Sequence, residues 1–347
     1  MKLWFSRGSN LLKIIFSYLI SRISGRVIHW GNPVAMSIEP NNTCNLRCPE
    51  CPAGLKELTR ARGHMQPELF NAILEQMLPQ LSWLTLYFQG EPFMSRNFFD
   101  FVSAARSRKI FVATSTNGHF LDDDSVTRTI ESGLNRLIIS LDGAGQQSYE
   151  AYRQGGDFNR VISGIRLLVK EKERLKSTTP EIILQCLVLK SNEHELEDIR
   201  KLGKTLGVDK VTFKTAQFND FENGNPLMPE NQKYSRYKQQ KTVSQTDYAG
   251  TEQFSPPRHL ATSPPPHFTI KHTLPNACFR MWSSCVITWD GKVVPCCFDK
   301  DAAHELGDIT RKPFSEIWRG KSYDEFRKKI LKNRKSIEIC SNCTQKL

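Results

Sequence analysis

The sequence has no apolar run long enough to cross a membrane. Its most apolar segment, "SNLLKIIFSYLISRIS" at residues 9–24, is interrupted by Lys13 and ends around Arg22. A membrane-spanning helix needs about 20 consecutive apolar residues. No small-x-small cleavage site follows the segment, so the features of a secretory signal peptide are also missing. We therefore expect neither an integral membrane protein nor an exported one, and we predict a cytoplasmic location.

The same segment predicts an amphipathic helix within an N-terminal extension, residues 1–33. Five apolar side chains recur on one face of this helix. They are Leu12, Ile15, Phe16, Leu19 and Ile23. The preferred interpretation is a helix docked on the main domain. A cationic helix lying on a membrane surface, and so a peripheral membrane contact, is the alternative.

The ten cysteines are not spread evenly, as they are in short disulfide-stapled proteins. Most of them form one tight group near residue 50 and a second group after residue 277. Clustered cysteines in a long chain indicate metal ligands in a reducing compartment. Metal binding is therefore the first function that the composition suggests.

The formal net charge is +12, and much of it lies in "RGKSYDEFRKKILKNRK" at residues 319–335. Phe326, Ile330 and Leu331 recur in this segment at helical spacing, which predicts a helix with a solvated basic face. A nucleic-acid-binding patch is the alternative. The segment lacks the interleaved aromatic residues that single-strand binding favours.

Six short apolar runs alternate with amphipathic helical patterns, which predicts a parallel sheet. The expected strands are residues 34–39, 83–88, 110–115, 136–141, 181–189 and 210–215. Polar or reactive residues follow every strand, and a barrel gathers such strand ends on one face. In a doubly wound sheet, by contrast, functional residues lie mainly in the loops beside the point where the strand order reverses. The dinucleotide-binding glycine fingerprint is also incomplete, because Ser148 stands at its last position.

The predicted fold is therefore α/β, a partial (β/α)6 TIM-like barrel at residues 34–215 followed by a small C-terminal cysteine-bearing domain at residues 278–347. Residues 216–277 are rich in proline and polar residues and show no sustained periodicity. This composition predicts a linker, or a mobile lid over the barrel mouth.

The first cysteine group directly follows the first predicted strand. Cys44, Cys48 and Cys51 have the spacing C-x3-C-x2-C. Three thiolates are one fewer than the four that close a structural zinc or iron–sulfur site. A four-iron cluster held by three thiolates leaves one iron open to an added ligand. A zinc site that borrows a distant histidine is the alternative.

This loop resembles the radical S-adenosylmethionine (SAM) superfamily, in which the methionine amino and carboxylate groups of SAM bind the open iron of a [4Fe–4S] cluster. The segment "QGEP" after the second strand resembles the family's GGEP motif, which contacts the methionine amino group. Gln89 stands where the first glycine of that motif usually is. The other matching positions are Gly90, Glu91 and Pro92.

The resemblance also assigns residues after the later strands to SAM. Ser140 and Asp142 match positions that contact the ribose, and Arg153 resembles the arginine that pairs with the SAM carboxylate. Glu50 departs from the family pattern, because many members carry an aromatic residue before the third cysteine. The remaining matched positions, which line the same face or pass the adenine, are Ser115, Asn117, Leu189 and Asn192.

The second cysteine group resembles the SPASM extension of radical SAM enzymes in its shorter, twitch-like form, covering residues 278–343. An Asp290-Gly291 hairpin turn would deliver one of its cysteines to a strand end. The resemblance implies one closed auxiliary [4Fe–4S] cluster for electron transfer, with zinc as the alternative. The implied ligands are Cys278, Cys296, Cys340 and Cys343.

Three cysteines remain outside these groups. Cys186 lies inside a predicted strand and is expected in the core, and Cys285 has no assigned role. Cys297 follows a predicted cluster ligand, a position that can carry a base in related enzymes. Cys297 and Asp299 are therefore the candidate catalytic residues, as a base or a hydrogen-atom donor, with packing as the alternative.

The resemblance predicts an oxidoreductase that reductively cleaves SAM to a 5′-deoxyadenosyl radical and takes a hydrogen atom from a peptide or small molecule. Oxidation, crosslinking and epimerisation are all open outcomes. The implied partners are the substrate and an electron donor such as flavodoxin or ferredoxin. A non-catalytic metal-binding module with a basic, nucleic-acid-binding C-terminus is the alternative function.

Overall fold

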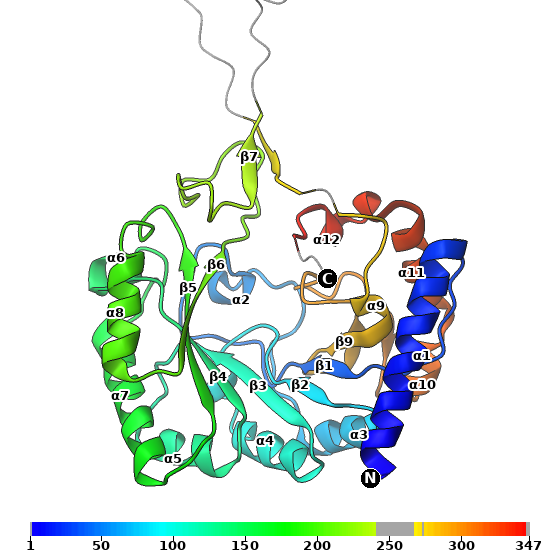
Figure 1. The fold of residues 1–347 in the computed structure, drawn as a ribbon, viewed down its shortest axis with the longest axis horizontal. Helices are drawn as coiled ribbons and strands as arrows, with labels where there is room; N and C mark the ends of the chain where they lie inside the picture. The colour runs from blue at the N-terminus through cyan, green and yellow to red at the C-terminus, as the bar shows by residue number, and fades with distance from the viewer. Residues whose placement is uncertain (1, 241–266, 273, 345–347) are drawn as a thin grey trace, which may run out of the picture.

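The computed structural model describes residues 2–240, 267–272 and 274–344. Its main feature is a sheet with the strand order β11-β10-β9-β1-β2-β3-β4-β5-β6 (Figure 1). Strands β1 to β6 run parallel, and each pairs with the next. Their bounds are β1 Ala35–Ile38, β2 Trp83–Thr85, β3 Phe111–Thr116, β4 Arg136–Ser140, β5 Glu181–Val188 and β6 Lys210–Thr215. The predicted partial barrel is confirmed.

Helices between these strands cover the outside of the barrel (Figure 1). The side chain of Asp122 accepts a hydrogen bond from the amide of Ser125 and caps α5, while Gly207 ends α8 in a left-handed conformation. The helices are α2 Pro52–Leu55, α3 Pro67–Met77, α4 Phe98–Ser107, α5 Asp123–Glu131, α6 Gln146–Glu150, α7 Phe158–Arg174 and α8 Leu196–Leu206, with a 3₁₀ turn, η1, at Pro92–Met94.

The C-terminal residues extend the barrel sheet at its β1 edge. Strand β9, Ser284–Ile287, pairs parallel with β1, and β10, Lys292–Val294, returns antiparallel. Gly291 in the predicted turn has φ +91°, a conformation that favours glycine. Strand β11, Gly307–Asp308, completes the edge. The accompanying helices are α9 Arg280–Ser283, α10 Phe314–Trp318, α11 Lys321–Asn333, η3 Arg334–Ser336 and α12 Glu338–Ser341.

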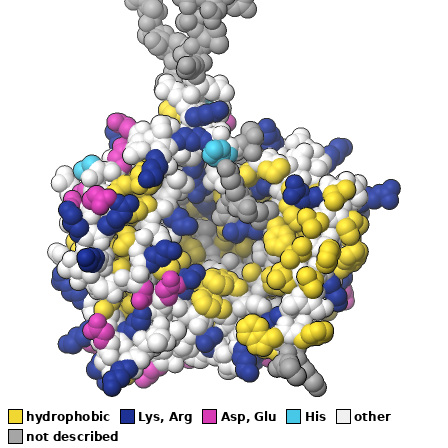
Figure 2. All heavy atoms as spheres, viewed as in Figure 1, with side chains coloured by type: hydrophobic (Ala, Val, Ile, Leu, Met, Phe, Trp, Pro, Cys, Tyr) yellow, Lys and Arg dark blue, Asp and Glu magenta, His cyan; other side chains and the backbone are white. Residues whose placement is uncertain are grey.

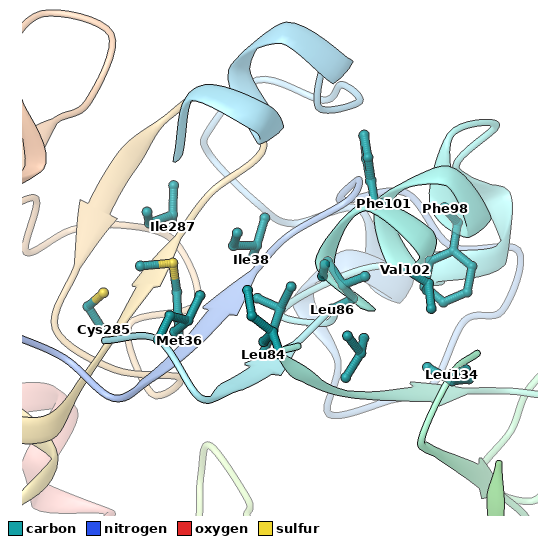
Figure 3. Close-up of a cluster of buried hydrophobic side chains, with 14 of the residues drawn as sticks. Met36, Ile38, Leu84, Leu86, Phe98, Phe101, Val102, Leu134, Cys285 and Ile287 are labelled. Carbon is teal, nitrogen blue, oxygen red and sulfur yellow. The ribbon is translucent and has the colours of Figure 1, made fainter. Parts of the chain in front are cut away.

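One hydrophobic core joins the barrel and the C-terminal strands. Met36 and Ile38 of β1 lie beside Cys285 and Ile287 of β9 in the cluster shown in Figure 3. Cys285 is 2% exposed, so its surroundings are those of a core side chain. The shared core fixes the C-terminal cysteines relative to the barrel mouth.

Part of the segment at residues 216–277 has regular structure that its composition did not predict. Strands β7, Tyr237–Gln239, and β8, Phe268–Ile270, pair antiparallel. The hydroxyl of Tyr237 accepts a hydrogen bond from the amide of Phe218 (3.0 Å) and donates one to Asn342 Oδ1 (2.9 Å). This segment therefore contacts the C-terminal domain. Residues 241–266, on which much of the lid prediction rests, lie outside the described residues.

Helix α1, Lys2–Ser24, packs on the C-terminal domain (Figure 1). The ring of Tyr18 lies edge-on to Trp282, with 5.3 Å between the centroids. Asn10 Nδ2 donates to the carbonyl of Asn32 (2.8 Å), and its Oδ1 accepts from the same residue's amide (2.9 Å). None of the helices that the structure describes is long and apolar enough to cross a membrane.

The predicted apolar face of α1 is not the buried one. Leu12, Phe16, Leu19 and Ile23 are 55%, 54%, 43% and 87% exposed. An amphipathic helix would ordinarily dock by that face, and this expectation is wrong here. The reason lies in the segment that follows the helix and runs back along the helix's polar side. Small side chains on that side let the segment come close, and polar side chains form hydrogen bonds with it. The buried positions are Asn10, Ile14, Ser17, Tyr18 and Ser21.

The basic C-terminal segment forms α11, as predicted, but one of its arginines is in the core. Arg327 is fully buried, with its guanidinium 4.6 Å from the ring centroid of Trp318 and 4.7 Å from that of Tyr323. Its Nε donates to the carbonyl of Met281 (3.0 Å). These cation–π contacts and this hydrogen bond give Arg327 a structural role in the core.

Candidate functional site

The loop after β1 carries Cys44, Cys48 and Cys51 at the mouth of the barrel. Asn41 fixes the start of the loop, because its Nδ2 donates to the backbone carbonyl of Glu91 (2.8 Å). A turn follows in which the amide of Cys51 donates to the carbonyl of Cys48 (3.1 Å). All three cysteines pack in one apolar cluster at this end of the barrel. The loop therefore presents three sulfur donors from one short segment.

Polar groups flank these thiols. Arg153 Nη1 lies 3.9 Å from Cys48 Sγ, and Asn117 Nδ2 lies 3.8 Å from Cys44 Sγ. Burial raises the pKa of the Cys44 thiol to about 12 and also raises the pKa of Cys48. A cation and an amide donor beside the sulfurs are the surroundings that stabilise thiolates once a metal has displaced their protons.

The QGEP segment crosses directly over the cysteine loop. Gly90 has φ +77°, and a Cβ on it would lie 2.7 Å from the carbonyl oxygen of Thr43, so only glycine fits. The carboxylate of Glu91 accepts hydrogen bonds from Thr116 Oγ1 and the amide of Asn117, both at 2.7 Å. Burial raises the pKa of Glu91 to about 7, against the opposing effect of these hydrogen bonds.

Asp142 holds Arg153 in place. Asp142 is fully buried, and its Oδ2 accepts from Arg153 Nε at 2.6 Å. Its Oδ1 accepts from the amide of Leu187 (2.6 Å). Burial alone would lower the pKa of Arg153, but Asp142 and Cys48 raise it well above its usual value. Arg153 is therefore a fixed cation directed at the cysteine loop.

The other strand-end residues have distinct positions. Asn192 joins the ends of β4 and β5, because its Nδ2 donates to the carbonyls of Asp142 and Leu187, both at 2.9 Å. Its Oδ1 accepts from the amide of Leu189 (2.9 Å). Its side-chain contacts are thus structural. The remaining predicted positions lie at neighbouring strand ends: Gln89 and Ser140 are buried, Pro92 begins η1, and Ser115 is half-buried.

The four C-terminal cysteines, Cys278, Cys296, Cys340 and Cys343, line one cavity. Arg334 lies at this cavity and is 4% exposed. Its Nη2 donates to Cys343 Sγ (3.4 Å) and its Nη1 to the carbonyl of Ala277 (2.6 Å). In the part of the chain that the structure describes, its Nε has no hydrogen-bond partner. A buried donor left unpaired at a four-thiol cavity fits a bound group that accepts hydrogen bonds.

The two cysteine sites differ in the number of sulfur donors that they offer. Among residues 2–240, 267–272 and 274–344, no three His, Cys, Asp or Glu side chains lie close enough to share a single metal ion. The donor sets are three sulfurs at the barrel mouth and four at the C-terminal cavity.

Two family profiles match this chain. The profile of the radical SAM superfamily matches residues 38–210, and that of the SPASM iron–sulfur cluster-binding domain matches residues 278–344. The chain belongs to the radical SAM superfamily. It is a radical SAM enzyme of the SPASM type, with SAM, a [4Fe–4S] cluster and auxiliary iron–sulfur chemistry as its cofactors. The sequence-based prediction of the family is confirmed, and a non-catalytic metal-binding module is not supported.

The similar proteins act on different molecules. A tungsten-containing aldehyde ferredoxin oxidoreductase cofactor-modifying protein of Pyrococcus furiosus is 24% identical over 88% of this chain and 86% of its own length. An AdoMet-dependent heme synthase of Nitratidesulfovibrio vulgaris is 22% identical over 85% of this chain and 81% of its own. The fold is also similar to Streptococcus suis SuiB bound to the precursor peptide SuiA, with a TM-score of 0.60 and 12% identity, covering 89% and 69% of the two chains.

Three side chains of this radical SAM enzyme lie at the two cysteine sites although sequence analysis did not select them. Tyr87 is 37% exposed. Burial of its hydroxyl and the nearby Cys51 raise its pKa, against the opposing effect of Arg153. Arg236, just before Tyr237, is also enclosed, and burial lowers its pKa. Arg334 is the third. Because side chains alternate between the two faces of a strand, the position of Tyr87 could have been predicted by counting back from the QGEP segment. No sequence pattern distinguishes the two arginines.

The predicted catalytic residues differ in their surroundings. Cys297 is half-buried and packs beside Phe88 and Val294. The carboxylate of Asp299 is 1% exposed and accepts from the amides of Ala303 (2.8 Å) and His304 (3.0 Å). These bonds favour a turn-capping role for Asp299, and catalysis by either residue stays a prediction. Cys186 is fully buried in β5, in agreement with a core position.

Proposed function

We propose that Cys44, Cys48 and Cys51 hold the SAM-binding cluster and that the enzyme removes a hydrogen atom from a peptide or small-molecule substrate at the barrel mouth. When bound, the cluster and SAM supply the 5′-deoxyadenosyl radical for this step. The observation that carries the proposal is the three-thiol loop with the Arg153 guanidinium 3.9 Å from Cys48 Sγ. A loop with three sulfur donors leaves one metal position for SAM.

The residues around the loop have separate tasks in this proposal. Arg153, fixed by Asp142, pairs with the SAM carboxylate, a task for which a planar guanidinium is suited. Glu91 and the backbone of the QGEP segment receive the methionine amino group. Ser140 would contact the ribose, and the backbone near Leu189 would pass the adenine. Asn192 acts indirectly by holding the ends of β4 and β5 together.

Arg153→Lys is expected to weaken SAM binding roughly tenfold, because an ammonium cannot make the paired hydrogen bonds of a guanidinium. The lysine keeps a positive charge beside Asp142, whereas alanine would leave that buried carboxylate unpaired at a cost of about 3–5 kcal/mol in stability. SAM affinity is measured by equilibrium dialysis of the reconstituted protein. Arg160→Lys, at an exposed position nearby, is the matched control. Unchanged SAM affinity in Arg153→Lys would contradict this role.

A cavity of about 420 Å³ beside the C-terminal domain is a candidate substrate site. It is lined by Gln217 after β6 and by Asp299 and Asn342 of the C-terminal domain. Its charged lining residues are Lys300 and three acidic residues, Asp299, Asp301 and Glu338. Both peptides and small molecules fit the proposal, because the similar proteins include a heme synthase and a protein bound to a precursor peptide.

The C-terminal thiols would hold one auxiliary cluster that accepts the substrate's second electron. In that case the product has lost two hydrogen atoms relative to the substrate, as in oxidation or crosslinking. If Cys297 instead returns a hydrogen atom to the substrate, the product is an epimer. The electron that starts the reaction would come from an acidic donor such as flavodoxin or ferredoxin, which the net charge of +12 suits.

The test is an anaerobic reaction of the reconstituted enzyme with SAM and a strong reductant. We expect 5′-deoxyadenosine and methionine, measured by mass spectrometry. With candidate peptides or metabolites in D2O, loss of two hydrogens indicates oxidation, and uptake of one solvent deuterium without other mass change indicates epimerisation. Absence of 5′-deoxyadenosine from protein with full iron content would refute the proposed function.

Arg334→Met is expected to lower the midpoint potential of the auxiliary cluster by about 60 mV or more, because a buried cation beside the thiolates favours the reduced, more negative state. The shift is measured by potentiometric titration with EPR detection. Lys335→Met removes the same charge from an exposed neighbour and should leave the potential unchanged. Equal potentials in Arg334→Met and the unsubstituted enzyme would contradict this role for Arg334.

A further inference from the structure

Helix α1 exposes a continuous apolar stripe. Of the twelve large hydrophobic side chains that are exposed in the described part of the chain, nine belong to the first 30 residues. Figure 2 shows the resulting apolar patch on the side of the molecule where α1 lies in Figure 1. The spacings of seven, four, three and four residues place the stripe on one face of the helix. Its members are Phe5, Leu12, Phe16, Leu19 and Ile23.

The opposite face is fixed to the protein, so the stripe cannot turn inward without breaking several hydrogen bonds. Ser21 Oγ donates to the carbonyl of Ile28 (3.0 Å) and accepts from its amide (2.9 Å). Arg7 donates to backbone carbonyls below the barrel, among them those of Leu81 (2.6 Å) and Lys109 (2.9 Å). The helix therefore holds its apolar face outward as part of the folded protein.

The charge of this region has one sign. The first acidic residue of the chain is Glu39, and five basic residues precede it. Lys13, Arg22 and Arg26 are exposed. An apolar stripe with basic flanks is typical of helices that lie in the plane of an anionic membrane surface. The five basic residues are Lys2, Arg7, Lys13, Arg22 and Arg26.

We infer that α1 docks this enzyme on an anionic lipid surface. The side chains of the stripe enter the headgroup region, and the exposed Trp4 and Trp30 lie at the boundary where tryptophan is favoured. A second copy of the chain is a poorer occupant, because it would bring two helices with only positive charges together. An anionic leaflet supplies the opposite charge. This inference does not rest on the chemistry proposed above.

The test is flotation of the full chain with lipid vesicles in a density gradient. We expect most of the protein to float with vesicles of phosphatidylcholine and phosphatidylglycerol, and little to float with phosphatidylcholine alone. Raising the salt concentration should reduce flotation, because it screens the attraction between the basic residues and the lipid headgroups. Protein that stays at the bottom with the anionic vesicles at low salt overturns the inference.

Leu12→Glu with Phe16→Glu should reduce partitioning to anionic vesicles by roughly tenfold or more, because two apolar anchors are lost and two negative charges added. Both side chains contact solvent, so the thermal unfolding midpoint should change little. Leu175→Glu, at an exposed position on the barrel, is the matched control and should float as before. Equal flotation of the double variant overturns the inference. So does a dimer in light scattering that the double variant dissociates, since the face would then be an interface between copies.

Discussion

Replacing Cys44, Cys48 and Cys51 together by alanine is expected to abolish 5′-deoxyadenosine formation under strong reductant. The three thiols lie in one loop at the barrel mouth, and no other described cysteine takes part in that loop's packing cluster. Without them no metal position remains for SAM at the mouth. Iron should fall to about four atoms per chain, because one closed site of the cubane type is left. The measurements are 5′-deoxyadenosine by mass spectrometry and iron by colorimetric assay.

The matched control for this triple variant is Cys285→Ala. Cys285 is more buried than the loop cysteines and lies on β9 in the core, outside both cysteine sites. This variant should keep both clusters and most of the SAM cleavage. SAM cleavage at the unsubstituted rate in the triple variant would show that the cluster is held elsewhere.

The barrel could be predicted from the sequence because its strands are short, continuous apolar runs. Runs of this kind are buried on both faces, which is typical of parallel sheets flanked by helices. The pairing of β9 with β1 could not be predicted, because residues 284–287 and 35–38 are far apart in the chain and either strand alone would fit many neighbours. The same limit applies to β7 and β8, each three residues long.

Helix α1 shows how periodicity predicts a helix without predicting its orientation. The periodicity predicts which residues share a face of the helix, but which face is buried depends on the neighbouring segment. Gly31 illustrates this dependence: a Cβ there would lie 2.5 Å from Ile14 Cγ1, so the returning segment crosses the helix at its small-residue side. Only the tertiary structure contains that information.

The clustering of the residues proposed for SAM could be predicted because they follow strands, and the ends of parallel strands meet. Asp142 and Arg153 are eleven residues apart and form an ion pair of 2.6 Å. No sequence pattern predicts the buried position of Arg334, because it lies in a run of basic residues that is typical of a solvated surface. Its burial follows from its place in η3, between α11 and α12, at the cavity that Cys340 and Cys343 also line.

Replacing Cys340 and Cys343 by alanine should separate radical formation from product formation. The loop at the barrel mouth is untouched in this variant, so SAM cleavage should continue. The C-terminal cavity keeps only two thiols, too few for a closed cluster, so iron should fall to about four atoms per chain. Product that requires loss of a second electron should then be undetectable, while 5′-deoxyadenosine accumulates. The measurements are iron content, EPR of the reduced protein and product analysis.

The control for this double variant is Ser341→Ala, an exposed position between the two cysteines that leaves both thiols in place. It should retain about eight irons per chain, since both cubane sites keep their thiolates.

EPR distinguishes the two clusters further. The signal left in the double variant should change when SAM is added, because its cluster has an open iron. The signal left in the Cys44, Cys48 and Cys51 triple variant should not change when SAM is added, because four thiolates already bind its remaining cluster. A C-terminal cavity that binds zinc and no iron after anaerobic reconstitution with iron and sulfide would contradict the auxiliary cluster.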